Sequence, residues 1–291
     1  MIRYVKHSEI DKQRWDDALE KCINPFPYAY SWYLDKVTNY QWDALILDDY
    51  SALFPLPFKK KFFLKVIYQP FFTQQLGLFA SRQETLNDIN NWLKAIPVHF
   101  VKTYLHLNSK NSLPNKPTRL THQVLLNRDY SYIYNDYSSV VTKNLKRIRN
   151  RGMQAESSQD VYSYIKFMKH NLGPKLSDLS PSDIDMLQGL LIEILERKKG
   201  FIRFCLDKNG NRIAGTFIIK SNARVIYLLA ASTQAGKKAN GMTYLIDNIM
   251  TELAGKEIVF DFEGSMIPGI AKFYKNFGGK EEHFPVIQKW L

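Results

Sequence analysis

The stretch EIVFDFEGSMIPGIAKFYKNFGG, residues 257–279, combines a short apolar strand, an acidic turn and a short helix. Its phenylalanines alternate with Asp261 and Glu263, which is the period of a strand with one packed and one polar face. Gly264 allows a ligand to approach the backbone of the turn closely, and Pro268 suits the start of the following helix. The turn is therefore a candidate site, although a polar turn that only caps the helix explains the same residues.

The short helix has one apolar face. At 100° per residue, Ile270, Phe273 and Phe277 share this face. Tyr274 lies among them, so its hydroxyl is directed inward, where it could protonate a leaving group. Packing in the core explains Tyr274 equally well.

Working outward from this stretch, both halves of the chain show the order strand, helix, helix, three strands, helix and strand. A further helix and strand are clear in the second half and degraded in the first. Between the halves we expect a strand at 121–127 and a long helix at 136–151. The other elements are expected at 3–6, 8–22, 29–37, 42–48, 51–58, 64–70, 82–95 and 98–107, and then at 153–157, 160–170, 180–198, 201–207, 212–220, 223–232, 239–254, 257–262, 269–276 and 283–290.

This order is that of the GNAT acyltransferases, and a tandem pair joined by a basic helix resembles the Fem family of aminoacyl and peptidyl transferases that build peptidoglycan cross-bridges. YSSVVTKNLKRIRNRG (137–152) resembles the family's connector helix. VIYLLAAS with ANGMTYLIDNIM (225–250) resembles its central strand and cofactor-side helix, and FDFEGS with GIAKFYKNFGG (260–279) resembles its active-site segment. SWYLDKV (31–37) places Lys36 where the family carries a substrate-binding lysine.

The resemblance implies an α/β fold with mixed sheets and two tandem GNAT-like domains. We expect the first domain at 1–130, the connector helix within 131–152 and the second domain at 153–291, with the last strand, 283–291, free to pack on the first domain.

The resemblance also implies N-acyl transfer to an amine, on a small molecule or a cell-wall precursor. In a GNAT sheet the fourth and fifth strands splay apart, and ligands of open α/β sheets bind where strands diverge, so the resemblance implies a reacting carbonyl between strands 223–232 and 257–262. Backbone N–H groups of 230–232 would polarise it, Asp261 or Glu263 would deprotonate the amine, and Tyr274 would serve the leaving group. The candidates for substrate binding are Lys36, Tyr227, Ser232, Ser265 and Lys275.

Tyr274 departs from the family pattern FKxxFG, because the sequence here reads Phe273-Tyr274-Lys275-Asn276-Phe277-Gly278. A lysine offers a permanent positive charge to a developing oxyanion, whereas a tyrosine offers a neutral hydrogen bond or a proton. A GNAT-fold protein that binds a phosphorylated or glycosylated ligand without catalysis is therefore the alternative function.

The donor depends on the loop before the helix at 239–254. GNAT enzymes that use coenzyme A hold its pyrophosphate on a Q/R-x-x-G-x-G/A loop at a helix start, where backbone N–H groups bind anions. This chain departs from that pattern at both ends, with KANGMT at 238–243. Acyl-CoA and aminoacyl-tRNA both remain candidate donors, and a solvated loop is the alternative. The candidates for holding a phosphate are Lys237, Lys238, Asn240 and Gly241.

The connector helix has a strongly basic face. Between residues 143 and 151 it carries five cations and no acid. Lys143, Arg147 and Arg151 are candidates for binding the phosphates of tRNA or another polyanion. A helix face that is simply solvated is the alternative.

Composition and the absence of common motifs exclude several classes of function. Forty Lys and Arg against 28 Asp and Glu give a net charge of +12, which favours anionic partners, although we do not expect DNA. Cys22 and Cys205 lie far apart without metal-ligand spacing, so no disulfide or metal is expected. The sequence has no Walker, GxGxxG, HExxH or GxSxG motif. It also has no long apolar run, so we expect a cytoplasmic protein without a membrane span.

Overall fold

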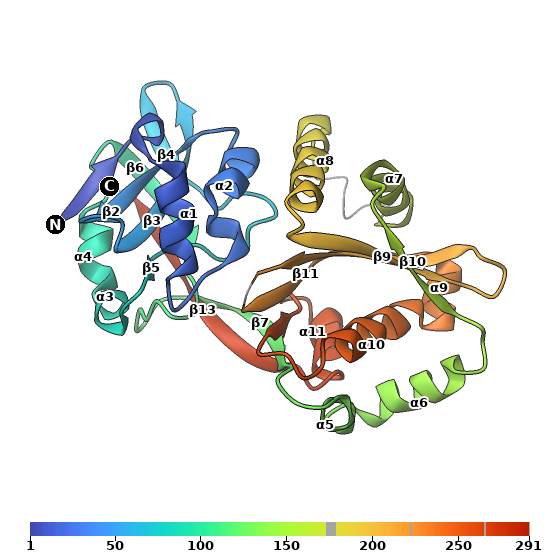
Figure 1. Ribbon diagram of the computed structural model, residues 1–291. Helices are drawn as coiled ribbons and strands as arrows, with labels where there is room; N and C mark the ends of the chain where they lie inside the picture. The colour runs from blue at the N-terminus through green and yellow to red at the C-terminus, as the bar shows by residue number, and fades with distance from the viewer. Residues whose placement is uncertain (173–178, 222, 265, 291) are drawn as a thin grey trace. The chain divides into compact units, whose positions relative to one another are not determined.

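The computed structural model describes residues 1–172, 179–221, 223–264 and 266–290 (Figure 1). The chain forms two compact units, one of Met1–Leu120 with Glu282–Leu291 and one of Thr121–Glu281. The first unit ends before residue 130, the boundary expected from the sequence, because Gln123 and its neighbours pair with a strand of the second unit.

The first unit contains a mixed sheet with the strand order β1-β2-β3-β4-β6-β13, and β5 lies beside β3. β4 and β6 run parallel, whereas the other neighbours are antiparallel. The strands are β1 (Ile2–Val5), β2 (Trp42–Leu47), β3 (Ala52–Lys61), β4 (Leu64–Ile67), β5 (Phe79–Ala80), β6 (Phe100–His106) and β13 (Lys280–Trp290). The helices are η1 (His7–Glu9), α1 (Lys12–Glu20), η2 (Pro27–Ala29), α2 (Ser31–Thr38), α3 (Gln83–Asn87) and α4 (Ile89–Lys94).

Aromatic side chains join the helices of the first unit to its sheet. Trp15 of α1 meets Trp42 of β2 edge-on, with ring centroids 5.0 Å apart. Trp92 of α4 stacks on Phe54 of β3 at 6.3 Å. All four side chains are buried, so large apolar surfaces fix these helices on the sheet.

The second unit contains a mixed sheet with the order β7-β12-β11-β10-β9-β8. Helices α7 and α8 lie on one face of this sheet, and α9, α10 and α11 lie on the other (Figure 1). The strands are β7 (Thr118–Leu125), β8 (Gln154–Ser158), β9 (Gly200–Leu206), β10 (Arg212–Lys220), β11 (Arg224–Ser232) and β12 (Val259–Asp261). The helices are α5 (Tyr130–Asn135), α6 (Ser139–Ile148), α7 (Val161–Leu172), α8 (Pro181–Glu196), α9 (Gln234–Ala239), α10 (Gly241–Leu253) and α11 (Pro268–Lys275).

The two units repeat one topology. In each, four antiparallel strands follow one another, a fifth pairs parallel to the fourth, and a sixth pairs antiparallel to the fifth. The sixth strand comes from outside this run: it is β13 in the first unit and β7 in the second. This repeat confirms the mixed α/β class and the internal repeat of architecture that the sequence predicts.

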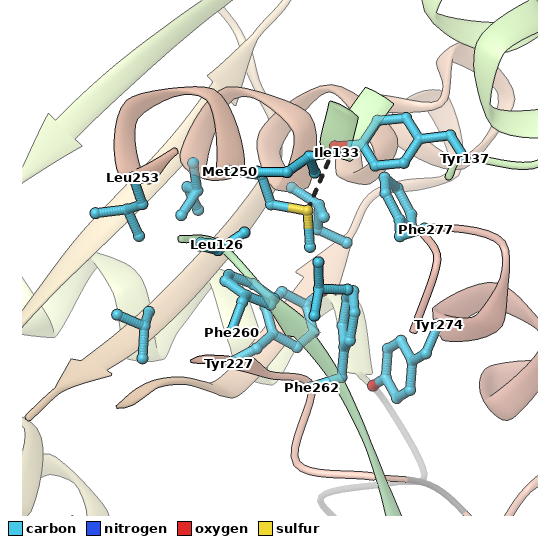
Figure 2. Packing of buried hydrophobic residues seen from close by; sticks show 14 of the residues in the cluster. Leu126, Ile133, Tyr137, Tyr227, Met250, Leu253, Phe260, Phe262, Tyr274 and Phe277 are labelled. Carbon is cyan, nitrogen blue, oxygen red and sulfur yellow. Dashed lines mark hydrogen bonds between the residues drawn. The ribbon is translucent and has the colours of Figure 1, made fainter. Parts of the chain in front are cut away.

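The core of the second unit lies between its sheet and α6, α10 and α11. Figure 2 shows Met250 and Leu253 facing the aromatic rings of Phe260 and Tyr227. The hydroxyl of Tyr137 donates to the Met250 sulfur at 3.3 Å. The aromatic side chains of the stretch quoted above therefore belong to a continuous apolar cluster.

Three helices differ from the sequence expectation for local reasons. The helix expected at 136–151 is the shorter α6, which begins at Ser139 because the Ser138 hydroxyl accepts from the Val141 N–H at 3.4 Å; α5 is a separate helix that ends at Asn135. The helix at 82–95 divides into α3 and α4 at Asp88. The helix expected at 239–254 is preceded by α9, where the Thr233 hydroxyl accepts from the Gly236 N–H at 2.9 Å.

Candidate functional site

The strands β11 and β12 diverge. They pair in parallel over Arg224–Ile226 and Val259–Asp261, and β11 then continues to Ser232. Beyond Ile226, β11 therefore has a side that β12 does not cover, as expected from the sequence.

A β-bulge lies in β11 where this divergence begins. The pairing with β10 passes from Ile218 opposite Tyr227 to Phe217 opposite Leu229, which leaves Leu228 as the extra residue. The Leu229 carbonyl accepts hydrogen bonds from the Tyr164 hydroxyl at 2.9 Å and the Thr216 hydroxyl at 3.0 Å. Because bulges redirect the backbone, these two hydroxyls fix the course of β11 along the gap.

A pocket of about 540 Å³ occupies the gap. Its walls are β11 from Tyr227 to Ser232, the turn at 262–264, one face of α11 and the end of α7. Its volume lies within the range of small-molecule sites, roughly 300 to 1,000 Å³. The turn EGSM thus borders a cavity, and the described part of the turn contributes Glu263 and Gly264 to the wall.

Tyr274 forms part of this wall and is 9% exposed. Its ring stacks on Phe262 at 4.5 Å and meets Tyr227 edge-on at 6.2 Å (Figure 2). Burial raises the pKa of Tyr274 above its ordinary value, and the nearby carboxylates of Glu263 and Asp261 raise it further. At neutral pH the side chain is therefore a protonated hydroxyl, which can donate a hydrogen bond into the pocket.

Glu263 is held in an unusual backbone conformation. Its φ is +56° and that of Gly264 is +54°, so two successive residues lie in the left-handed region. Such a conformation costs a residue with a side chain on the order of 1 kcal/mol and is concentrated at functional sites. The turn orients Glu263 into the wall of the pocket instead of continuing the strand.

Asp261 has a different environment from Glu263. It is 1% exposed, and it accepts hydrogen bonds from the Arg224 guanidinium and the Thr121 hydroxyl, both at 2.5 Å. Its carboxylate does not line the pocket. The two acids that the sequence offers as bases are thus separated by burial, and Glu263 is the one beside the cavity.

His122 on β7 was not a candidate in the sequence analysis. It is fully buried, its ring centroid lies 5.9 Å from that of Tyr274, and neither ring nitrogen has a hydrogen-bond partner among the described residues. Burial lowers the pKa of His122, whereas Glu281, whose Oε1 lies 3.9 Å from Nε2, opposes that shift. The imidazole is therefore neutral behind Tyr274. The available signal was a pair of adjacent polar residues, Thr121 and His122, at the start of the strand expected at 121–127.

The candidates for phosphate binding have separate positions. Lys237 lines the pocket, whereas Lys238 is exposed outside it. Asn240 joins α9 to α10 with a φ of +60°. Gly241 is buried, and a Cβ there would lie 3.3 Å from Ala214, so this glycine allows α10 to pack closely on β10.

The substrate-binding candidates are also dispersed. Tyr227 and Ser232 line the pocket. Lys275 is outside it and forms an ion pair with Glu281 at 2.6 Å. Lys36 lies on α2 in the first unit and is partly exposed, and Ser265 lies outside the described residues.

The basic face of α6 is present in the structure. Val141, Leu145 and Ile148 are buried against the core. Within the described part of the chain, the opposing cations form no ion pair. These exposed side chains are Lys143, Lys146 and Arg147 on α6, and Arg149 and Arg151 directly after its end.

The described residues were also considered for a metal site and for a membrane-spanning helix, and they form neither. Among them, no group of three or more histidine, cysteine, aspartate or glutamate side chains is arranged to hold a metal ion. None of the helices in these ranges has both the length and the apolar character needed to cross a bilayer.

No protein-family model and no curated protein match the sequence, but solved structures match its fold. The crystal structure of FemX has a TM-score of 0.71 at 14% identity, covering 97% of this chain and 96% of that chain. The structure of L-PGS from Bacillus licheniformis has a TM-score of 0.57 at 12% identity, covering 96% and 92%. A conserved protein of unknown function from Bacteroides thetaiotaomicron has a TM-score of 0.55 at 10% identity, covering 99% and 100%. The chain therefore shares the fold of the FemX crystal structure over nearly its whole length, with the tandem repeat that the order of its elements predicts.

Proposed function

We propose that the protein transfers an acyl or aminoacyl group to an amine acceptor in the pocket of the second unit. The observation that carries this proposal is the position of Glu263 and Tyr274 on the wall of the cavity where β11 and β12 diverge. One side chain can accept a proton and the other can donate one, and both border a space that suits a small substrate.

The donor carbonyl lies along the uncovered side of β11. Backbone N–H groups of 230–232 polarise it, and the bulge at Leu228, with the Leu229 carbonyl fixed by two hydroxyls, supports this orientation. Preorganised donors of this kind stabilise the oxyanion because they need no reorganisation during the reaction.

The acceptor amine attacks the carbonyl carbon and forms the new C–N bond. The amine proton passes to Glu263, and the bond from the carbonyl carbon to the sulfur of coenzyme A, or to the ribose oxygen of tRNA, breaks. Tyr274 donates a hydrogen bond or a proton to that leaving atom. Asp261 positions the turn, since its carboxylate is engaged with Arg224 and Thr121.

The donor is acyl-CoA or aminoacyl-tRNA, and Lys237 binds one of its phosphates. Lys237 supports this assignment because it lines the pocket, on a helix that follows β11 directly. The basic face of α6 would bind the tRNA backbone in the second case. Either donor places the reaction in the cytoplasm, and the acceptor is a small molecule or a cell-wall precursor.

A binding protein without catalysis is the second candidate function. It is favoured by one observation: burial and two carboxylates raise the pKa of Tyr274 away from neutrality, which makes its hydroxyl a weaker acid at the position where the Fem pattern FKxxFG has lysine.

The test incubates the purified full chain with pools of acyl-CoAs or aminoacyl-tRNAs and with amine acceptors, including peptidoglycan precursors. Mass spectrometry should detect an acceptor heavier by one acyl group. Glu263→Gln should lower the rate by about 10²-fold or more, whereas the exposed control Glu257→Gln should not. Stabilisation by a ligand without turnover of any donor would instead support the binding protein and reject transfer.

A further inference from the structure

The hairpin between β3 and β4 has an apolar tip. Lys61 pairs with Leu64, so Phe62 and Phe63 form a two-residue turn. Phe62 is 89% exposed, Phe63 is 103% exposed and Leu64 is 49% exposed. Three large apolar side chains therefore project into solvent at the end of one hairpin.

The requirements of the turn do not explain these side chains. Two-residue hairpins favour glycine or asparagine, because the first position needs a positive φ. Phe62 has a φ of +55°, which is unfavourable for a bulky residue. The chain thus places aromatic rings where the local backbone favours small residues, and those rings make no use of the protein core.

The stem of the hairpin is basic. Lys59 and Lys60 are exposed, and Lys60 lies directly opposite Lys65 in the strand pair. Like charges opposite each other destabilise a strand pair, so this arrangement does not serve the sheet. The charge of Lys65 is balanced by an ion pair with the buried Asp43 at 2.5 Å. The sequence between Asp49 and Glu84 contains no acidic residue that could balance Lys59 and Lys60 locally.

A further exposed apolar side chain lies near the stem. Val98, in the segment before β6, is 83% exposed. The next residue, His99, accepts a hydrogen bond from the Lys65 N–H at 3.4 Å, which places this segment beside β4. The apolar surface therefore extends beyond the turn to a neighbouring loop.

We propose that the β3–β4 hairpin binds the surface of a membrane that contains anionic lipids. Phe62 and Phe63 insert at the boundary between headgroups and acyl chains, where aromatic rings are favoured. Lys59 and Lys60 then contact the negatively charged headgroups, which basic residues near a membrane surface attract. The charge of the stem selects a lipid surface over a neutral apolar partner. This inference does not depend on acyl transfer.

Vesicle flotation tests the proposal with the full chain. The protein should float with vesicles of phosphatidylcholine and phosphatidylglycerol at low salt, and much less with phosphatidylcholine alone. Phe62→Ser/Phe63→Ser should weaken binding by at least about 10-fold, because the burial of two rings is lost. The matched variant Tyr132→Ser/Tyr162→Ser, which removes two exposed rings from the second unit, should bind like the wild type.

Lys59→Gln/Lys60→Gln should also weaken binding and reduce its dependence on salt. Failure of the wild type to bind the mixed vesicles at low salt, or equal binding by the phenylalanine variant, overturns the proposal. Light scattering tests whether the hairpin instead binds a second copy of the chain. If the wild type is a dimer and the phenylalanine variant is a monomer, the hairpin is a dimer contact and the membrane proposal is overturned.

The depth of the tip can be measured independently. Cys22 and Cys205 are both buried, so a polarity-sensitive thiol dye on a Phe63→Cys variant reports on the tip alone. Its emission should shift to shorter wavelength with the mixed vesicles, whereas dye on Tyr132→Cys should not respond. Equal emission from Phe63→Cys with and without vesicles contradicts insertion.

Discussion

The backbone N–H of Glu263 donates a 2.9 Å hydrogen bond to Oδ1 of Asp261. The Asp261 carboxylate is itself buried and held by Arg224 and Thr121, whereas Glu263 borders the pocket. One acid therefore fixes the turn that presents the other, and substitutions of the two should have different consequences.

Asp261→Asn should destabilise the protein by about 3 to 5 kcal/mol, because it removes the carboxylate charge that the largely buried Arg224 guanidinium contacts at 2.5 Å. Urea unfolding followed by circular dichroism measures this change. The exposed Asp185→Asn is the matched control and should change the unfolding free energy by less than about 0.5 kcal/mol. A small effect at Asp261 would mean that the turn is held by other contacts.

Tyr274→Phe should lower transfer with little change in stability, because no described residue is bonded to the hydroxyl, which borders the pocket. Tyr164→Phe is the contrasting variant: its hydroxyl donates to the Leu229 carbonyl inside the fold, and because that carbonyl keeps the Thr216 hydroxyl as a donor, the loss should cost about 0.5 to 1.5 kcal/mol. Thermal melting and steady-state rates separate the two effects. A destabilised Tyr274→Phe protein with full activity per folded molecule would exclude Tyr274 as the group that serves the leaving atom.

Lys237→Glu and Lys238→Glu form a matched pair of adjacent charge reversals. Lys237 lines the pocket and Lys238 does not, so only the first should weaken the binding of a phosphate-bearing donor, by about 10-fold or more. Isothermal titration calorimetry with each donor provides the measurement. Equal losses in both variants would indicate a general effect of net charge and not a contact in the pocket.

The basic face of α6 should bind polyanions. Changing Lys143, Arg147 and Arg151 together to glutamine should lower the affinity for tRNA and flatten its dependence on salt, since fewer counterions are released. Filter binding over a series of salt concentrations gives the slope. The control removes the same charge from exposed lysines elsewhere, namely Lys110, Lys116 and Lys256. The same slope in both triple variants would make α6 a solvated strut.

Stability should fall as the pH decreases from about 6.5 to about 4. Burial, with a smaller contribution from Arg119, lowers the pKa of His106 to about 4, although its contact with the Gln74 carbonyl opposes the shift. Between these values the unfolded chain binds a proton that the folded chain excludes, so the loss is up to about 1.4 kcal/mol per pH unit from this group.

Urea unfolding at several pH values measures this slope. His106→Gln should flatten it, whereas the exposed His170→Gln serves as its control. His99 and His122 also have lowered pKa values, so part of the slope should persist in His106→Gln. An unchanged slope in His106→Gln would assign the effect to the other two histidines.

The sequence predicts the architecture well because strand and helix periodicities are local properties. The order of elements gives the repeat, and the resemblance to the GNAT sheet gives the divergence of β11 and β12. The start of α6 depends on the hydroxyl of Ser138, whereas the helical pattern of the sequence extends back to residue 136. The 3.6-residue periodicity of apolar residues indicates a helix but does not locate the capping residue at its start.

The chemical environment of each candidate residue was less accessible to sequence. Asp261 and Glu263 have the same charge and lie on the same side of the strand pattern, yet tertiary partners bury one and leave the other beside the cavity. Gly241 occupies the place of a glycine in the phosphate-binding loop, but in the structure the close packing of α10 on Ala214 explains why the residue is a glycine. His122 contacts Tyr274 from a distant strand, a proximity that no local pattern encodes.

The sixth strand of the first unit, β13, lies at the far end of the chain from the rest of that unit, and this has a consequence for biosynthesis. Because β13 follows all of the second unit in the chain, the ribosome completes β6 long before the strand that pairs with it. Until then the edge of β6 from Lys102 to His106 is an open template for intermolecular pairing. The first unit therefore keeps an unpaired edge until the end of synthesis. The second unit does not, because β7 is synthesised before the strand β12 with which it pairs. We therefore expect chains truncated before residue 282 to aggregate more readily than the full chain.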